Sequence, residues 1–176
     1  NPAARTTCIK PAGTTSLVLG TSSGIHAWHS EYYIRRIRVG KNEAIYSYLQ
    51  NNFPDLVEDE YFNPTEQAVI SIPQKAPKGS ILRNEEVFTL LERIKRFSIR
   101  WVNPGHKDGL NSHNVSAVLP YDGGTYIQAP FETINKEKYE EMCANLGDIN
   151  LDNVIETSDE TDRQGEIACA GGYCEI

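Results

Sequence analysis

The chain has 176 residues, of which 39% are hydrophobic and 23% charged, and its formal net charge at pH 7 is −7. This length suffices for one domain with a substantial core, and the composition is that of an ordinary globular protein. No apolar run approaches the length of a membrane span, so we expect no membrane attachment and a cytoplasmic location.

The negative charge is concentrated near one end of the sequence. Residues 148–176 contain eight acidic residues and one basic residue, whereas residues 1–147 contain 16 of each. A neutral body with an acidic tail argues against binding to long nucleic acid but allows one small phosphorylated ligand. Because residues 148–176 hold few large aliphatic side chains, burial cannot offset the entropy of ordering them. We therefore predict a folded body over residues 1–147 and a flexible tail over residues 148–176.

The first half of the chain contains three predicted strands and one helix. The first strand covers residues 6–9 and leads into a hydroxyl-rich turn. The second covers residues 32–39, where Tyr33, Ile34 and Ile37 occur among three arginines. A short helix over residues 42–51 is predicted to be capped by Asn42. The apolar run at residues 68–73 predicts the third strand.

The second half begins with the clearest helix, which we predict to be capped by Asn84. Its apolar residues recur at helical spacing, and they are Val87, Leu90, Leu91, Ile94, Phe97 and Trp101. A strand at residues 114–119, an extended segment at 125–129 and a helix at 136–146 follow. Alternating strands and helices are typical of an α/β protein with right-handed crossovers. Since three or four strands cannot close a barrel, the chain is interpreted as one arc of a larger fold.

Two cysteines near the end of the chain form a candidate redox pair. Cys169 and Cys174 are separated by a segment that contains two adjacent glycines, which allow the chain to fold back and bring the sulfurs together. A mobile, exposed dithiol in a reducing compartment is suited to thiol–disulfide exchange. The alternative is half of a zinc site, which would need two further ligands, and the tail contains no histidine.

A glycine-containing turn after the first strand forms a candidate phosphate site. Its residues are Pro11, Ala12, Gly13, Thr14, Thr15 and Ser16. Backbone N–H groups and hydroxyls in such a turn can hold a phosphate, particularly if a helix begins there. The spacing is not that of a Walker loop, and the residues alone favour an ordinary turn.

Other polar and thiol side chains are given structural roles. His26 and His29 have the spacing of a metal-ligand pair but lack a third ligand nearby, so we interpret them as loop residues and predict no metal site. Cys8 and Cys143 are predicted to be small buried residues. The arginines of the second strand are expected on a solvated or interdomain face.

Several segments carry a family resemblance when they are taken together and in order. They are Thr6-Thr7-Cys8-Ile9-Lys10-Pro11-Ala12-Gly13-Thr14, Gly24-Ile25-His26, Tyr33-Ile34-Arg35-Arg36, Asn114-Val115-Ser116 and the Cys-x4-Cys motif of the tail. This set resembles the large chain of the adenosylcobalamin-dependent (class II) ribonucleotide reductases. The similarity is densest in the first 40 residues and extends over most of the chain.

The resemblance implies a fold and a set of roles. In that family the catalytic domain is a ten-stranded α/β barrel, of which this chain would supply the C-terminal part. Residues 11–16 would hold the phosphates of the ribonucleotide substrate, and Cys169 and Cys174 would re-reduce the disulfide that each turnover leaves in the barrel. A thioredoxin-like protein would be the external reductant. Adenosylcobalamin would be bound mainly by the remaining, N-terminal part of the enzyme.

The sequence departs from the family pattern at three points. Ala12 stands where the family usually has serine, and Cys8 stands where many relatives have no cysteine, so Cys8 is given no role. The Asn-x-Cys-x-Glu motif, which carries the radical cysteine in the family, does not occur in the 176 residues. We therefore expect the chain to be inactive without its missing part.

Two alternatives remain open at this point. The large chain of a di-iron-dependent (class I) reductase would ordinarily carry adjacent tyrosines shortly before the tail, whereas Tyr32 and Tyr33 lie much earlier. A non-enzymatic dithiol or phosphate-binding module would fold cooperatively by itself.

Overall fold

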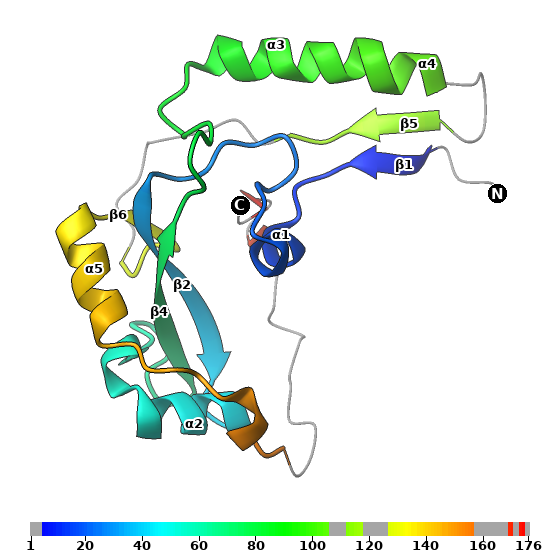
Figure 1. The fold of residues 1–176 in the computed structure, drawn as a ribbon. Helices are drawn as coiled ribbons and strands as arrows, with labels where there is room; N and C mark the ends of the chain where they lie inside the picture. Colours follow the sequence, from blue (N-terminus) through cyan, green and yellow to red (C-terminus); the bar gives the residue numbers. More distant parts are fainter. Residues whose placement is uncertain (1–4, 106–111, 118–126, 157–168, 171–172, 175–176) are drawn as a thin grey trace. The chain divides into compact units, whose positions relative to one another are not determined.

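The computed structural model describes residues 5–105, 112–117, 127–156, 169–170 and 173–174 (Figure 1). The chain divides into two compact units, each of them discontinuous in sequence. The first comprises Asn1–His29, Pro77–Asp122 and Ala168–Ile176, and the second comprises Ser30–Ala76 and Gly123–Ile167. None of the described helices combines the length and the apolar composition that crossing a bilayer requires.

The first unit is built on a parallel strand pair and one long helical segment. Its described elements are β1 (Arg5–Ile9), α1 (Gly13–Leu19), α3 (Val87–Phe97), the π-helical turn η2 (Ser98–Val102), α4 (Asn103–Gly105), β5 (Ser112–Val115), β7 (Cys169–Ala170) and β8 (Tyr173–Cys174). Strands β1 and β5 run parallel, with Thr7 opposite His113 and Cys8 opposite Asn114. The strand predicted at residues 6–9 is confirmed, and β5 begins two residues earlier than predicted.

Helix α3 confirms the predicted helix but not its predicted cap. The N-cap residue is Glu86 rather than Asn84, because residues 82–85 form a turn in which the Glu85 N–H donates to the Leu82 carbonyl at 3.1 Å. Leu90 is buried, with 1% of its surface exposed. Four of the other stripe residues are exposed, and they are Val87, Leu91, Phe97 and Trp101. Most of the predicted apolar face is therefore open in this chain.

The second unit is a four-stranded antiparallel sheet with helices packed on it. Its described elements are β2 (Tyr32–Gly40), α2 (Ala44–Asn52), η1 (Pro54–Leu56), β3 (Val57–Asp59), β4 (Gln67–Lys75), β6 (Phe131–Thr133), α5 (Lys136–Ala144) and η3 (Leu151–Asn153). The strand order is β3-β4-β2-β6, and every pairing is antiparallel. The predicted mixture of helix and sheet is confirmed, but among the described strands only β1 and β5 pair in parallel.

The two faces of this sheet differ in polarity, because directly opposed residues of neighbouring strands share a face. On one face Ile37 lies opposite Ile70 and Ile70 opposite Val57, and a core of Leu49, Leu56 and Ile70 joins α2 and η1 to the sheet. The other face carries Arg36, Arg38 and Glu58. Arg36 and Arg38 share this face because they are two positions apart in β2, whereas Arg35 lies on the same face as Ile37.

The N-terminal ends of α2 and α5 involve different side-chain contacts. Asn42 was predicted to cap α2, but the N-cap residue is Glu43, whose carboxylate accepts the Gly40 N–H at 2.9 Å. Helix α5 begins at Lys136 as predicted, because the Asn135 side chain accepts the Lys138 N–H at 2.8 Å.

The predicted flexible tail coincides only in part with the described residues. From residue 148 onward the structure describes residues 148–156 and the short strands β7 and β8. The boundary after residue 147 and the predicted mobility stay predictions, because the rest of the segment lies outside the described residues.

Candidate functional site

The candidate phosphate residues form the approach to helix α1 and its first turn. Gly13 is the first helical residue and Ala12 is the N-cap residue, with φ −120° and ψ 83°. Alanine has no side-chain oxygen, so no side chain caps the first turn, and the N–H groups there keep their capacity to bind an anion. A helix therefore begins within residues 11–16, which is the arrangement that favours phosphate binding by such a turn.

The hydroxyl groups of this turn have different environments. Ser16 is buried, with 6% of its surface exposed, and its hydroxyl donates to the Gly13 carbonyl at 3.3 Å. Ser16 therefore stabilises the helix turn. Thr15 is exposed at the surface of the turn, so its hydroxyl has access to a ligand.

A second loop of the same unit, which contains Ser23 and Gly24, contacts the backbone of residues 10–12. The Ala12 N–H donates to the Ser23 hydroxyl at 2.9 Å. Gly24 has φ +61°, and a Cβ at this position would lie 3.0 Å from the Lys10 carbonyl oxygen. Only glycine combines this backbone conformation with so close an approach. The Gly-x-His segment is thus a backbone support for the residues that lead into α1.

His26 belongs to the support loop rather than to a metal site. The residue is buried, and its Nδ1 lies 2.8 Å from the Ser23 carbonyl oxygen. Within the described part of the chain, no group of three histidine, cysteine or carboxylate side chains could hold a metal ion. The interpretation of His26 as a loop residue agrees with this hydrogen bond.

Helix α3 contacts the support loop through Arg93, a residue that the sequence did not single out. Its guanidinium donates to the Ile25 carbonyl at 3.0 Å and to the Glu85 carboxylate at 2.9 Å. The neighbouring segment is bound by backbone hydrogen bonds, because the Trp28 N–H donates to the Ile81 carbonyl at 2.8 Å. The sequence signal for this arrangement is an arginine near the middle of a helix that two glutamates, Glu85 and Glu86, precede.

The backbone positions of the candidate redox pair lie opposite each other. In the antiparallel pair β7–β8, Cys169 is the partner of Cys174 and Ala170 is the partner of Tyr173. Directly opposed residues of antiparallel strands have Cα atoms about 4.5 to 5.5 Å apart. This separation falls within the range that disulfides span. The register therefore suits reversible closure of a disulfide.

The remaining cysteines differ from their predicted environments. Cys8 was predicted to be buried but is exposed, because among the described strands β1 is paired only with β5. Cys143 is half-buried on α5. We assign neither residue to the site.

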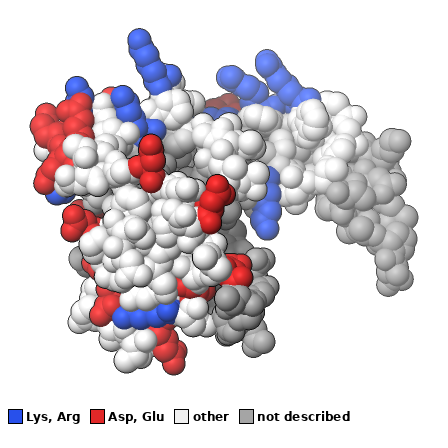
Figure 2. All heavy atoms as spheres, turned by 60° about the horizontal axis from the view of Figure 1, so that its bottom comes forward, with Lys and Arg blue, Asp and Glu red and all other residues white. Residues whose placement is uncertain are grey.

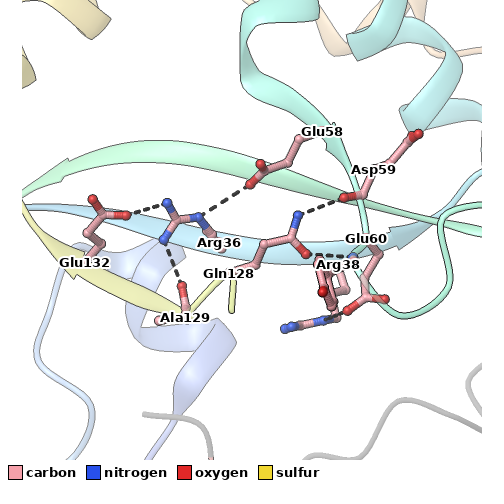
Figure 3. Close-up of polar contacts among 9 residues, drawn as sticks. Arg36, Arg38, Glu58, Asp59, Glu60, Gln128, Ala129 and Glu132 are labelled. Carbon is pink, nitrogen blue, oxygen red and sulfur yellow. Dashed lines mark hydrogen bonds and ion pairs between the residues drawn. The ribbon is translucent and has the colours of Figure 1, made fainter. Parts of the chain in front are cut away.

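Two arginines of β2, Arg36 and Arg38, belong to a charged network on one face of the four-stranded sheet (Figure 3). Arg36 forms ion pairs with Glu58 and Glu132, and its guanidinium donates to the Ala129 carbonyl at 3.0 Å. Only 15% of its side chain is exposed, so the prediction of a solvated face is wrong for Arg36. Because its charge is already compensated within the unit, Arg36 is not a candidate ligand for phosphate.

The same network fixes the turn after β3. Glu60 lies 3.5 Å from the Arg38 guanidinium, and its carboxylate accepts the N–H groups of Phe62 and Asn63, both at 2.7 Å. Burial tends to raise the pKa of Glu60, but these N–H donors and Arg38 together hold the pKa below its ordinary value. Gln128, with φ +52°, donates to the Asp59 carbonyl and accepts the Tyr61 N–H (Figure 3).

Charged side chains of both signs occur across the face drawn in Figure 2. Large uncharged areas separate them. This distribution agrees with the balanced charge of residues 1–147 and does not resemble the continuous basic surface that binds long nucleic acid.

Comparison with known proteins gives a consistent set of relatives. No protein-family model matches the chain. A probable adenosylcobalamin-dependent ribonucleoside-triphosphate reductase of Dictyostelium discoideum is 31% identical over 175 residues, which cover 82% of this chain and 22% of the relative. An adenosylcobalamin-dependent ribonucleoside-triphosphate reductase of Lacticaseibacillus paracasei is 27% identical over 201 residues, which cover 99% of this chain and 27% of the relative. The chain is homologous to a part of the adenosylcobalamin-dependent ribonucleotide reductases.

The reductase homology confirms the resemblance inferred from the sequence motifs. A crystal structure of a B12-dependent (class II) ribonucleotide reductase has the same fold over 82% of this chain and 23% of its own, with a TM-score of 0.61 and 21% identity. The chain spans about a quarter of the length of these reductases.

Proposed function

We propose that this chain is the C-terminal part of an adenosylcobalamin-dependent enzyme that reduces ribonucleotides to 2′-deoxyribonucleotides. One observation carries the proposal: the match to the Lacticaseibacillus paracasei reductase extends over 99% of the chain. Both the turn at residues 11–16 and the cysteine pair therefore fall within or next to the matched region. We place the enzyme in the cytoplasm, where a dithiol is kept reduced.

In this proposal residues 1–147 belong to the catalytic ten-stranded α/β barrel, and residues 148–176 form the redox tail. The parallel pairing of β1 and β5 supports this assignment for the first unit, because a barrel of this kind consists of parallel strands with helices outside. The antiparallel sheet of the second unit does not add to this support. The exposed apolar stripe of α3 supports it as well. Contiguous apolar surface on a protein ordinarily marks an interaction site, and the remaining part of the barrel would cover it.

Residues 11–16 bind the phosphates of the substrate. The support for this role is the helix that begins at Gly13 without a side-chain cap, because its first N–H groups and the positive end of its dipole favour an anion. Ala12 lacks the serine hydroxyl that the family usually supplies, so the backbone N–H groups and the exposed Thr15 hydroxyl provide the contacts.

Cys169 and Cys174 return electrons to the active site. Each reduction of a ribose releases the 2′-hydroxyl as water and converts two barrel thiols into a disulfide. A thiolate of the tail attacks that disulfide, and the second tail thiol then attacks the mixed disulfide. The barrel pair is thereby reduced and the tail pair oxidised, and a thioredoxin-like dithiol protein reduces the tail in turn. The opposed positions of the two cysteines in β7 and β8 support this role.

Adenosylcobalamin, when bound, supplies the radical that starts the reaction. We place its site mainly in parts of the reductase outside this chain, because the chain spans only 22% to 27% of the length of the relatives. We assign no residue of this chain to the cofactor.

Combining the chain with the remaining part of the reductase tests the proposal. We expect conversion of a ribonucleoside triphosphate to its 2′-deoxy form only when adenosylcobalamin is added. Turnover without the cofactor, as a di-iron enzyme would give, would contradict the class assignment.

The role of the cysteine pair is tested in the same assay. Cys169→Ser should abolish repeated turnover with the external protein reductant but preserve a single turnover of pre-reduced enzyme. Cys143→Ser, which removes a half-buried thiol on α5, is the matched control and should leave both measurements unchanged. Loss of the first turnover in Cys169→Ser would exclude a pure shuttle role.

A further inference from the structure

Arg93 makes three hydrogen bonds that connect two segments of the first unit. It donates to both oxygens of the Glu85 carboxylate, and it donates to the Ile25 carbonyl at 3.0 Å. The side chains of Arg93 and Glu85 are 17% and 8% exposed. A bidentate Arg–Glu pair fixes the orientation of the guanidinium plane. The two bonds to Glu85 therefore set the direction in which the Arg93 guanidinium donates to the Ile25 carbonyl.

The Ile25 carbonyl lies next to the residues that support the turn at residues 11–16. Gly24, the preceding residue, packs against the Lys10 carbonyl, and Ser23 accepts the Ala12 N–H. Contacts thus run without a gap from α3 to the N-terminal turn of α1: Glu85 to Arg93, Arg93 to Ile25, and the loop at residues 23–25 to residues 10–12. A displacement of the Ile25 carbonyl would be passed to the backbone that precedes Gly13.

We propose that Arg93 is a positioning residue for the phosphate-binding turn, acting through the Ile25 carbonyl, with Glu85 fixing its guanidinium. The inference rests on the proposed role of residues 11–16 in binding substrate phosphate. Arginine is required at this position because lysine is a point charge on a flexible stem and cannot hold the bidentate pair and the carbonyl bond in one plane. The helix α3 of the barrel wall thereby sets the geometry of the substrate site without touching the substrate.

Binding of cytidine triphosphate and of cytidine to the complete reductase tests this role. In Arg93→Met, the dissociation constant for cytidine triphosphate should rise about tenfold, which corresponds to the loss of one charge-assisted positioning contact, while that for cytidine should change less than twofold. A general loss of structure would weaken both ligands equally. Arg96→Met, which removes an exposed arginine one turn further along α3, is the matched control and should change neither constant.

Arg93→Lys provides a second measurement if Arg93→Met does not fold. This variant keeps the positive charge beside Glu85 but loses the planar fork, so amide hydrogen exchange at residues 23–26 should become faster while exchange in the second unit is unchanged. Unchanged exchange at residues 23–26 would overturn the inference. Preserved preference for cytidine triphosphate over cytidine in Arg93→Met would overturn it as well. If the unmodified enzyme itself shows no such preference, the assignment of residues 11–16 fails and the role of Arg93 fails with it.

Discussion

The two units of the chain differ in how they are held together. The second unit has an apolar core of Leu49, Leu56 and Ile70 between its sheet and α2. Ala68 and Val69 of β4 are completely buried as well. In the first unit the described buried residues are Ile25, Leu90, Ser16 and His26. Loops of this unit are held mainly by hydrogen bonds to backbone carbonyls, and several of its large apolar side chains are exposed.

This difference indicates where the chain depends on the rest of the reductase. A sheet with its own core has the burial that independent stability requires. A parallel pair of two strands with an exposed apolar helix does not, because parallel strands are ordinarily covered on both faces. The unit that carries the candidate phosphate site is thus the one that we expect to be completed by the missing part of the barrel.

The largest expected effect is a loss of core packing in the second unit. Ile70→Ala should lower the free energy of unfolding by about 3 kcal/mol, because a side chain that is 5% exposed leaves a cavity. Phe88→Ala in the first unit removes a side chain that is 72% exposed. This substitution should change the free energy of unfolding by less than about 0.5 kcal/mol.

Urea denaturation distinguishes the two units in that experiment. Both tryptophans, Trp28 and Trp101, belong to the first unit, so their fluorescence reports on it, while circular dichroism reports on both units. Ile70→Ala should move the circular dichroism transition more than the fluorescence transition. Equal shifts would show that the two units unfold together, and the expected difference in their stability would be wrong.

A smaller effect is expected from glycine substitutions in the first unit. Gly20 and Gly24 share φ +61°, but a Cβ at Gly20 would meet no atom within 4 Å, whereas one at Gly24 would meet the Lys10 carbonyl oxygen at 3.0 Å. Gly20→Ala should cost about 1 kcal/mol for the backbone conformation alone, and Gly24→Ala about 2 kcal/mol. Both losses of stability can be measured from urea unfolding curves followed by tryptophan fluorescence. Equal losses would mean that the close approach to Lys10 relaxes without cost.

The smallest effect concerns the pH dependence of the second unit. The pKa of Glu60 in the folded chain lies below the ordinary value of 4.5, so its carboxylate stabilises the fold above that pH and loses the contribution as the pH falls through the folded pKa. Glu60→Gln does not titrate. The difference in unfolding free energy between the two proteins should therefore be full near neutral pH and shrink in acid below about pH 4.5. A difference independent of pH would assign the effect to shape rather than charge.

The sequence allowed the elements to be predicted where local pattern decides them. The tyrosines and branched aliphatic residues of β2 favour a strand, the apolar stripe of α3 favours a helix, and both elements are confirmed. The caps of α2 and α3 were misplaced because Asn42 and Asn84 are favoured by local propensity. In the structure the turns before these helices are instead occupied by contacts of Glu43 and Glu85.

The contacts that join distant segments could not be predicted. The three-residue strand β6 has too short a pattern to be detected, and its pairing with β2 joins residues about 100 positions apart in the chain. The same is true of Arg93, whose partner Ile25 is 68 residues away and contributes a backbone carbonyl, a group that every residue carries. The motifs located the turn at residues 11–16, whereas the side chains that support it became visible only in three dimensions.

The register of the β7–β8 hairpin has a kinetic consequence. In the exchange that we propose for the tail, the first thiol would form a mixed disulfide, and the lifetime of that adduct would depend on how soon the second thiol attacks. Because Cys169 and Cys174 are opposed along the backbone, the second thiol acts at a high effective molarity and does not wait for a diffusional search. The adduct should therefore be short-lived, so that the tail is released with both electrons delivered rather than trapped on the enzyme it serves.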